Sequence, residues 1–419
     1  MRPLRLGLVP NLWQFSLLAL DNVFVGMLVG SERTVVPLLG SQIVAVTSTA
    51  VLLTFVVAFG IVKGPLNLVA GRLADRYGRR NVLLAGWLLG LPVPWMLLFA
   101  PSWGWVVAAN LLLGANQGFT WSMTVTGKLD LVGNRQRGLA LGVNEFSGYV
   151  GVAIASAVTG ALASAYGLRP VPFIFAAIVA VFGLLLVLLI GETKPFVQLE
   201  HAAEAGGAPL SAAPLREVFA EVTWRDRTLR ACSQAGTFNK FSDTGIWVLL
   251  PIAMAAQGFS PTIIGAVAGA YAFSWGVAQL ASGTLSDHVG RKPLIVVGLL
   301  LNAGGLALAG ISHVLAIWFA AALLVGIGTA ALYPVLLAAV SDVAAPACRG
   351  TALGVYRLWR DGGYALGGVA IGLAASRLNP GGSFIALAIL LLASAVLTQW
   401  WMRETHSPTR IGVVQGQPT

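Results

Sequence analysis

The sequence predicts an all-α membrane protein with twelve transmembrane helices in two six-helix bundles. Three observations carry this prediction: a composition poor in charge, a series of long apolar runs, and an internal repeat. The chain has 419 residues, of which 57% are hydrophobic and 10% are charged. About a quarter of the residues of a soluble protein are normally charged, so most of this surface must face lipid. The 50 glycines agree with this, because helices in lipid pack through small residues.

Apolar runs of about 20 residues are long enough to cross a bilayer as helices. Such runs follow one another along the chain, separated by short polar segments, and each is expected to form one span. The expected spans are residues 12–39, 47–70, 81–100, 104–126, 139–165, 169–191, 230–256, 261–284, 293–311, 314–339, 351–375 and 383–402.

The longest polar stretch predicts a linker between two domains. Residues 1–191 are expected to form the first six-helix bundle and residues 192–229 a cytoplasmic linker. Residues 230–419 are expected to form the second bundle with a short cytoplasmic tail. Within the linker, Ala202–Pro209 is rich in alanine and glycine, and Leu215–Leu229 has the pattern of an amphipathic helix on the membrane surface.

Lysine and arginine predict the orientation in the membrane. The loops on one side contain only Arg169 and Arg377, whereas most of the other basic residues fall on the opposite side. Because basic loops stay in the cytoplasm, both termini are expected there, in a multi-pass protein of the cell (inner or plasma) membrane. The basic residues placed in cytoplasmic loops include Arg72, Arg76, Arg79, Arg80, Lys128, Arg135, Arg137, Lys194, Arg291, Lys292 and Arg349.

Several other classes of protein are disfavoured. The net charge of +10 does not indicate nucleic-acid binding, because the basic residues form no face with interleaved aromatics. Cys232 and Cys348 form no spaced set of metal ligands, so neither a metal nor a cofactor is expected. The expected partners are the lipid bilayer, a small-molecule substrate and protons, and one chain is expected to work as a monomer.

An internal repeat relates the two halves of the chain. Adding 212 to positions in the first half gives matching residues in the second half, without gaps. Six spans with a cytoplasmic linker make up one repeat, so the halves have parallel topology about an axis along the membrane normal, one of the plans of alternating-access transporters. The matches include Gly71, Leu73, Asp75, Gly78 and Arg79 with Gly283, Leu285, Asp287, Gly290 and Arg291; Asp130 with Asp342; Arg137-Gly138 with Arg349-Gly350; and Glu192-Thr193 with Glu404-Thr405.

The repeated turn between the second and third spans carries a family resemblance. Residues 71–80 read GRLADRYGRR, and residues 283–292 read GTLSDHVGRK in the corresponding turn of the second half. This pair resembles the signature loop of the major facilitator superfamily and its second copy. The resemblance covers essentially the whole chain and implies the twelve-helix fold and the rocker-switch mechanism, but no substrate.

The same resemblance implies a gate at the cytoplasmic ends of the two halves. Asp75 and the basic cluster would latch the halves together in the outward-facing state, although these arginines also suit topology alone. Asp130 with Arg137, and Asp342 with Arg349, share a spacing of seven residues and are either further gate pairs or surface charge. The expected gate residues are Gly71, Asp75, Arg76, Gly78, Arg79, Gly283, Asp287, Gly290, Arg291, Asp130, Arg137, Asp342 and Arg349.

The chain departs from the drug-antiporter branch of this family. That branch carries an arginine in the fourth helix and a Gly-Pro motif in the fifth. Here Asn110 occupies the arginine's place, and the Gly148–Gly151 segment has no proline. A drug/proton antiporter is therefore the alternative interpretation.

Acidic residues inside the spans are candidates for proton coupling. A charge near the bilayer centre costs about 2.5–3.5 kcal/mol on insertion scales, so such residues are usually paired or functional. Asp21 and Glu32 share one face of the first helix, Asp21 near its cytoplasmic end, and Lys63 is within expected reach of Glu145. Glu145 or Glu32 is the expected coupling carboxylate. The full set of candidates is Glu32, Glu145, Asp21, Asp243 and Asp361.

Basic and polar residues inside the spans suggest the substrate. Arginine suits carboxylate or phosphate groups through paired hydrogen bonds, so an anionic or zwitterionic solute is expected. Lys240 with Asp243, and Arg357 with Asp361, are also spaced to form pairs that only hold helices together, and Arg33 falls near the external mouth. The substrate-binding candidates are Arg33, Lys63, Asn116, Gln117, Asn239, Lys240, Arg357, Arg360 and Tyr364.

These observations predict a proton-coupled secondary transporter of a small organic solute, and not an enzyme. An embedded enzyme would need a nucleophile with a base, or a metal set, and the chain has only four histidines. A primary pump would need a nucleotide-binding Gly-Lys motif, and a channel would not be expected to have paired latch loops. A non-transporting sensor on the same fold is the second alternative, because a fold does not determine a function.

Overall fold

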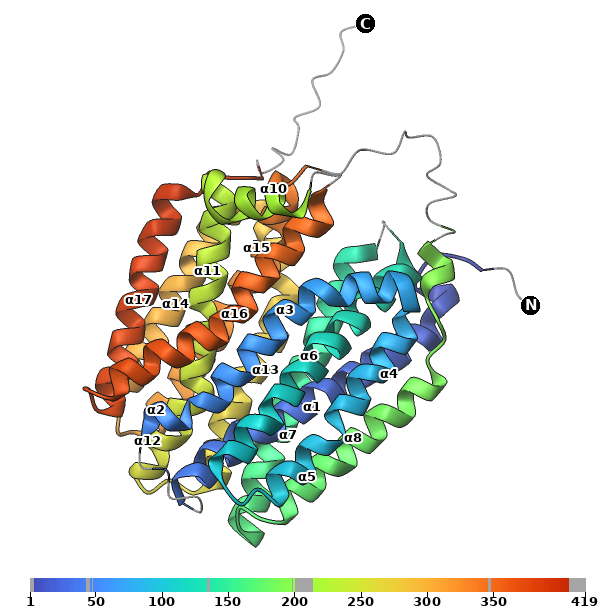
Figure 1. Ribbon diagram of the computed structural model, residues 1–419. Helices are drawn as coiled ribbons and strands as arrows, with labels where there is room; N and C mark the ends of the chain where they lie inside the picture. Colours follow the sequence, from blue (N-terminus) through green and yellow to red (C-terminus); the bar gives the residue numbers. More distant parts are fainter. Residues whose placement is uncertain are drawn as a thin grey trace, which may run out of the picture.

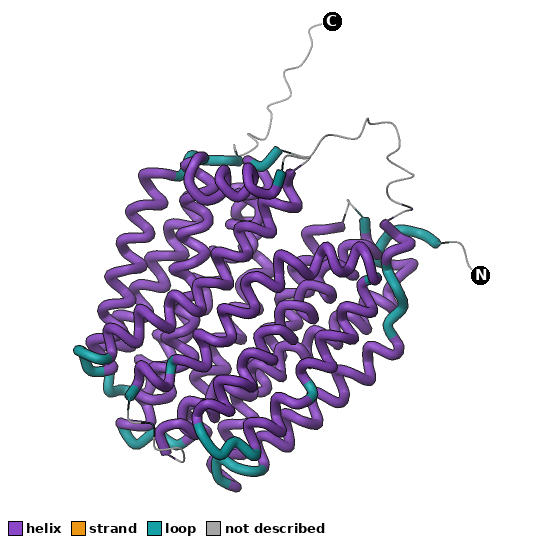
Figure 2. Tube along the Cα trace, viewed as in Figure 1, coloured by secondary structure: helices purple, strands orange, loops and turns teal. Residues whose placement is uncertain are grey.

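The structure is a computed structural model that describes residues 4–42, 46, 48–133, 136–197, 199, 214–345 and 348–406. Every regular element in these residues is a helix, and the long helices run side by side (Figure 2). This confirms the prediction of an all-α protein.

The first half of the chain forms the helices drawn in blue to green in Figure 1. The expected spans 47–70 and 81–100 are each divided, the first at Leu53 and the second at Leu91, just before Pro92. A proline has no N–H to continue a helix, so it starts a new one. The helices are α1 Leu12–Gln42, α2 Thr49–Leu52, α3 Thr54–Tyr77, α4 Arg79–Gly90, α5 Pro92–Leu98, α6 Trp103–Val132, α7 Arg137–Tyr166 and α8 Val171–Leu189, preceded by the short η1 Val9–Asn11.

The second half forms the helices drawn in yellow-green to red. Its first span is divided by a wider π-helical turn, η4 Gly245–Leu249. The other helices are α11 Arg227–Thr244, α12 Leu250–Ala256, α13 Pro261–Val289, α14 Arg291–Ile311, α15 Leu315–Val343, α16 Arg349–Ala375 and α17 Pro380–Trp401.

The linker differs from the expected amphipathic helix over 215–229. The helix consists of α10 Leu215–Ala220 and the π-helical η3 Glu221–Arg225, and it stops at Asp226. The Asp226 carboxylate instead accepts a hydrogen bond from the Leu229 N–H at 2.8 Å and caps α11. Val218 and Val222 are buried, and α10 contacts α16, so this helix packs on protein. The expected flexible piece Ala202–Pro209 lies outside the described residues.

Each expected span coincides with a helical stretch of the structure. By length and composition, 9 helices of the described residues are apolar enough to cross a membrane. The stretches that fall short are α6, α11 with α12, and α16, which carry buried charges such as Lys128, Asp243 and Asp361. The count of twelve spans, and the domain division at residues 191 and 230, stay predictions.

The two halves meet along two pairs of helices, α7 with α13 and α3 with α16. Glycines allow this close approach: a Cβ on Gly265 would lie 2.5 Å from the Ser156 carbonyl oxygen, and one on Gly60 would lie 2.5 Å from the Ala365 nitrogen. We call the end of the bundle that carries the turns 71–80 and 283–292 the motif end, and the opposite end, with Tyr166 and Pro261, the far end.

The contact between the halves is uneven along the bundle. At the far end, a Cβ on Gly160 would lie 2.5 Å from the Pro261 carbonyl oxygen. At the motif end, a Cβ would meet nothing within 4 Å at any of four glycines, namely Gly71, Gly138, Gly283 and Gly350. The two halves are therefore tightly packed at Gly160, whereas the four glycines at the motif end face open space. Close to the motif end the halves still touch, since a Cβ on Gly354 would lie 2.8 Å from the Leu68 side chain.

Candidate functional site

The first repeated turn is held by a compact network of charges. Gly78, with φ of +91°, makes the turn between α3 and α4. The Arg79 guanidinium is 2.8 Å from the Asp75 carboxylate and 3.0 Å from that of Asp130. The backbone N–H groups of Arg79 and Arg80 both donate to the Glu192 carboxylate, at 2.9 and 3.1 Å. Glu192 therefore caps the N-terminus of α4, where a negative charge is favoured.

The second half builds the same network 212 residues later. Gly290 has φ of +97°, and Arg291 lies 2.7 Å from Asp287 and 3.3 Å from Asp342. Glu404 accepts from the N–H groups of Arg291 and Lys292, at 2.8 and 3.1 Å. The Thr193 hydroxyl donates to the Asp130 carboxylate at 2.7 Å. The Thr405 hydroxyl donates to the Asp342 carboxylate at 3.1 Å. The residues matched in sequence thus play matching parts in space, which supports the repeat.

The expected pairing of Asp342 with Arg349 is wrong. Asp342 pairs with Arg291, while the Arg349 Nε donates to the backbone carbonyl of Ser341 at 3.0 Å. The α14 N-terminus brings Arg291 to Asp342 from a distant part of the chain, which a spacing of seven residues does not reveal. Asp130 likewise pairs with Arg79. The described ion pairs of Asp75 and Asp287 lie within one half each, so a latch between the halves stays a prediction.

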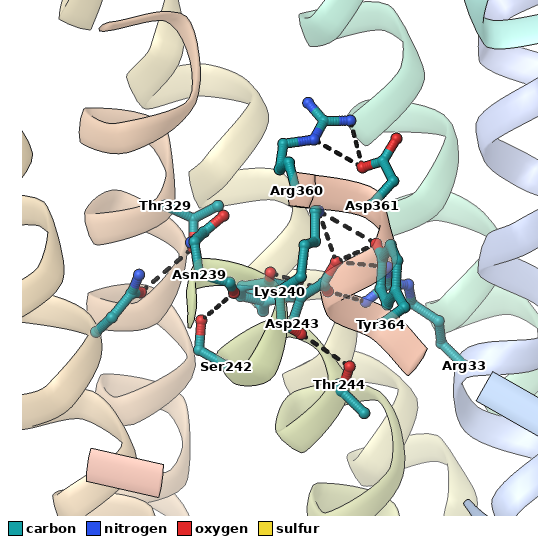
Figure 3. A network of polar contacts seen from close by, with 12 residues as sticks. Arg33, Asn239, Lys240, Ser242, Asp243, Thr244, Thr329, Arg360, Asp361 and Tyr364 are labelled. Atoms are coloured by element: carbon teal, nitrogen blue, oxygen red, sulfur yellow. Dashed lines mark hydrogen bonds and ion pairs between the residues drawn. The ribbon is translucent and has the colours of Figure 1, made fainter. Parts of the chain in front are cut away.

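A buried cluster around Asp243 connects the two halves (Figure 3). Arg33 on α1 donates to both oxygens of the Asp243 carboxylate on α11, at 2.6 and 3.4 Å. Lys240 lies 3.1 Å from the same carboxylate, and the Tyr271 hydroxyl donates to it at 3.0 Å. The Tyr364 hydroxyl also donates to Asp243. The expected Lys240–Asp243 pair is present, and Arg33 lies inside the molecule, only 3% exposed. Its expected place near the external mouth stays a prediction.

A second charged group lies beside this cluster, on α16. Asp361 pairs with the neighbouring Arg360 at 2.6 Å and accepts a hydrogen bond from Asn67 on α3, in the other half. The expected pair of Arg357 with Asp361 is therefore wrong. Arg357 is partly exposed and makes no ion pair with any described residue. Arg360 instead stacks over the Tyr333 ring at 4.3 Å, so contact with α15 selects the arginine that meets Asp361.

Lys63 on α3 is buried without an acidic partner among the described residues. Its ammonium nitrogen lies over three aromatic rings, at 5.2 Å from Phe59, 5.5 Å from Trp121 and 5.7 Å from Tyr364. The rings offer their negative faces to this cation. Lys63 was expected to reach Glu145, but the Glu145 carboxylate accepts from the Trp121 indole at 2.9 Å and from Asn144 at 3.1 Å.

At the centre, buried cations outnumber the carboxylates that contact them directly. The cations are Arg33, Lys63, Lys240 and Arg360, and the carboxylates in direct contact with them are Asp243 and Asp361. This contacting group has two more cations than carboxylates, in a region from which water is largely excluded. Glu145 lies nearby, beside the Trp121 ring that also contacts Lys63. Such a region has strong electrostatic interactions and attracts an anion.

Lys128 is a buried residue that sequence reasoning assigned to a cytoplasmic loop. Because α6 continues to Val132, Lys128 is fully buried, and its ammonium donates to Asn144 at 2.6 Å. Asn144 in turn donates to Glu145, so a chain of hydrogen bonds joins Lys128 to Glu145 and Trp121. The apolar residues within 127–132 could have indicated that the expected span 104–126 continues by more than one turn, to Val132.

The two acids of α1 lie apart from the central cluster. Asp21 accepts from the Trp87 indole at 3.0 Å and is fully buried. Glu32 is 2% exposed and faces the Asn110 side chain, and neither of its oxygens has a well-formed hydrogen bond to a described residue. Asn110 thus stands beside an acid at the place where the drug-antiporter branch has its arginine.

Three of the expected substrate-binding residues have structural partners. Asn116 donates to the Gly86 carbonyl at 2.9 Å, and Gln117 donates to the Val25 carbonyl at 3.0 Å, so both tie neighbouring helices of the first half together. Asn239 donates to Thr329 at 3.1 Å within the second half. These side chains are buried and bonded to neighbouring helices, and their role in substrate binding stays a prediction.

Two matched bundles with a repeated charged turn, joined by a buried polar cluster, have the architecture of a membrane transporter. The chain belongs to the Major Facilitator Superfamily, whose model matches residues 22–239 and 233–415. This confirms the resemblance seen in the two turns.

Named relatives are transport proteins. The 3-(3-hydroxy-phenyl)propionate transporter of Escherichia coli (strain K12) is 28% identical over 346 residues, which cover 79% of this chain and 81% of that protein. The multidrug resistance protein MdtG of Enterobacter lignolyticus (strain SCF1) is 26% identical over 342 residues, covering 80% and 78%. YajR, an inner membrane transport protein of Escherichia coli (strain K12), is 31% identical over 197 residues, covering 45% of this chain and only 42% of YajR.

Solved structures share the fold. A POT family transporter in complex with a thioalcohol-conjugated peptide superposes with a TM-score of 0.73 and 12% identity, over 92% of this chain and 95% of that chain. The same coverage is found for a POT family transporter in complex with 5-aminolevulinic acid, with a TM-score of 0.72. At this identity the likeness concerns the fold alone.

Proposed function

We propose that this transporter moves a small organic anion or zwitterion with an apolar body across the membrane by proton-coupled alternating access. The observation that carries the substrate class is Lys63, a buried cation ringed by aromatic side chains and without an acidic partner among the described residues. A carboxylate would pair with Lys63, and the rings of Phe59, Trp121 and Tyr364 would contact the body of the substrate. The relative named for 3-(3-hydroxy-phenyl)propionate, an aromatic carboxylate, supports this class.

The same contacts support an alternating mechanism. Two contacts join the halves near the centre, Arg33 with Asp243 and Asn67 with Asp361. At the far end, glycines let the helices of the two halves pack closely. The open space at the motif end corresponds to a state that opens there. A substrate carboxylate would compete with Asp243 for Arg33 and Lys240, and so would loosen a contact that must break before the far end opens. We place the motif end and both termini in the cytoplasm, with one chain as the working unit.

Counterflow in proteoliposomes tests this proposal. Liposomes that contain the purified protein are loaded with unlabelled 3-(3-hydroxyphenyl)propionate, and the labelled acid is added outside. We expect saturable exchange of the acid and none of its neutral amide, because only the acid carries the charge that Lys63 meets. Exchange of the amide at the same rate would refute the substrate class. Failure of every solute to exchange would favour a non-transporting sensor.

A multidrug carrier is the second candidate. The relatives named MdtG support it. The buried acids Glu32 and Glu145 support it too, because a lipophilic cation would pair with a carboxylate. A labelled lipophilic cation in the same counterflow experiment separates the two candidates. Exchange of the cation in place of the acid would favour the drug carrier.

Glu145 is the carboxylate that we propose for proton coupling. It is 5% exposed, one of its oxygens has no hydrogen-bond partner among the described residues, and it shares Trp121 with Lys63. Glu145→Gln is expected to abolish substrate-driven proton movement, read with a pH-sensitive dye in the liposomes, while counterflow persists. Glu32→Gln is the matched variant. If proton movement survived in Glu145→Gln and was lost in Glu32→Gln, Glu32 and not Glu145 would be the carboxylate that couples proton movement to transport.

Close packing of α7 on α13 is expected to be essential for the cycle. Gly265→Val places a side chain against the Ser156 carbonyl and forces the halves apart, at a cost of about 1–3 kcal/mol in unfolding free energy. Counterflow should fall at least about tenfold. Gly304→Val adds the same side chain where a Cβ meets nothing within 4 Å, and it should leave transport and the melting temperature nearly unchanged. Equal effects of the two variants would contradict this role of the interface.

A further inference from the structure

A groove runs along the outer surface of the second half, between α11, α16 and η3. Its volume is about 520 Å³, within the range of pockets that hold small molecules. Much of its wall is apolar and open to the surroundings: Leu366, Val369 and Leu373 on α16 are 48%, 53% and 68% exposed. None of the residues of the Asp243 cluster lines this groove, so it is a separate site.

The polar side chains that line the groove are satisfied by the protein, with one exception. Thr223 accepts from the Trp359 indole at 3.0 Å, and Gln234 is bonded to Thr398 at 2.8 Å. The exception is Arg230, whose Nε is buried with no hydrogen-bond partner among the described residues. Its guanidinium lies 4.1 Å from the Trp401 ring centroid and has no carboxylate partner in the part of the chain that the structure describes.

The surroundings of Arg230 have the character of a membrane interface. Trp224 and Trp400 are 56% and 76% exposed close to this end of α11 and α17, and tryptophan gathers where lipid headgroups meet the hydrocarbon region. The segment before Arg230 carries Arg216, Arg225 and Arg227 together with Glu217, Glu221 and Asp226, so its charges nearly cancel. The attraction for an anionic lipid therefore rests on Arg230 itself.

We infer that this groove binds an anionic phospholipid. The phosphate of the headgroup would pair with the Arg230 guanidinium, whose fork of N–H donors matches phosphate oxygens. One acyl chain would lie along the wall formed by Phe238, Leu366 and Val369. The choice of occupant rests on charge complementarity, because a single unpaired cation stands at the motif end of a groove that is otherwise apolar and faces the lipid.

Binding of defined lipids to the full-length protein tests this inference. The protein is purified in a neutral detergent and titrated with phosphatidylglycerol or with phosphatidylcholine of the same acyl chains, and bound lipid is counted by native mass spectrometry. We expect tighter binding of phosphatidylglycerol. Arg230→Ala should weaken it by about fivefold and remove the preference for the anionic headgroup. Arg403→Ala removes an exposed arginine at the same end and should keep the preference.

A second variant tests the groove itself. Val369→Trp fills the wall while Arg230 stays in place, and it should weaken the binding of both lipids. Arg230→Lys retains a charge and should restore part of the preference, which shows that Arg230→Ala has not failed merely by unfolding. Equal binding of the two lipids to the unaltered protein, or a preference that persists in Arg230→Ala, would overturn the inference. Displacement of the lipid by 3-(3-hydroxyphenyl)propionate would make the groove a substrate site instead, and would overturn it too.

Discussion

Asp243→Asn is expected to lower the rate of transport at least about a hundredfold and to destabilise the protein. The Asp243 carboxylate is fully buried and receives Arg33, Lys240, Tyr271 and Tyr364. Removing one partner of a buried ion pair leaves an uncompensated charge and typically costs about 3–5 kcal/mol. Thermal unfolding of the purified protein and counterflow in proteoliposomes measure the two effects.

A double variant separates stability from mechanism. Arg33→Gln with Asp243→Asn removes both charges of the pair, so part of the lost stability should return. Lys240, which also contacts Asp243, keeps its charge in both variants. Transport should not return, because the contact across the two halves is absent and Arg33 is no longer available to a substrate. Glu217→Gln is the control, since this exposed carboxylate of the linker helix makes no ion pair with a described residue and should matter little. Full transport in the double variant would exclude the Arg33–Asp243 pair from the mechanism.

Lys63→Gln is expected to weaken binding of an organic acid about tenfold to a hundredfold. A hydrogen bond to a charged group is worth about 1.5–3 kcal/mol, which corresponds to such a change in the dissociation constant. Stability should hold, because Lys63 has no acidic partner among the described residues, while Asp361 keeps Arg360 and Asn67. The dependence of counterflow on the concentration of 3-(3-hydroxyphenyl)propionate measures the affinity.

The control for Lys63 is Arg80→Gln, which removes a cation at the motif end that donates to backbone carbonyls of α8. The affinity of the Arg80→Gln variant for the acid should match that of the unaltered protein. If Lys63→Gln bound the acid normally, the excess positive charge would have to act through Arg33, Lys240 or Arg357. Arg357→Gln is then the next variant, because Arg357 is the partly exposed cation on the face of α16 that carries Asp361 and Tyr364.

Much of the fold was predictable because its signals are local in the sequence. Apolar runs mark spans wherever the chain crosses lipid, and the structure has a helical stretch at each expected run. The repeat was equally visible, and the structure shows what its copies Glu192 and Glu404 do, since each caps the helix that follows a repeated turn. The breaks inside α11–α12 and the end of the linker helix at Asp226 were missed, because they depend on local hydrogen bonding that hydropathy does not report.

The candidate site was predictable as a set of residues but not as a set of contacts. Buried charges were correctly singled out on α1, α11 and α16. Their partners were not: Arg33 meets Asp243, 210 positions away, and Asn67 meets Asp361, 294 positions away. Spacing along one helix suggested Arg357 for Asp361, whereas the rotation of α16 against α15 and α3 brings Arg360 into contact.

The sequence alone determined the class of the protein, its helices and the relation between its halves, since hydrophobicity and repetition are properties of the chain read in order. Tertiary structure decided which charges neutralise one another and which remain, because that depends on how helices distant in the sequence cross. Lys128 shows the difference: it is an ordinary loop lysine by position, and only the continued α6 and its packing against α7 enclose it beside Asn144. The position of Lys63 among aromatic rings and without a direct ion pair to a described residue, from which the proposed substrate follows, arises in the same way.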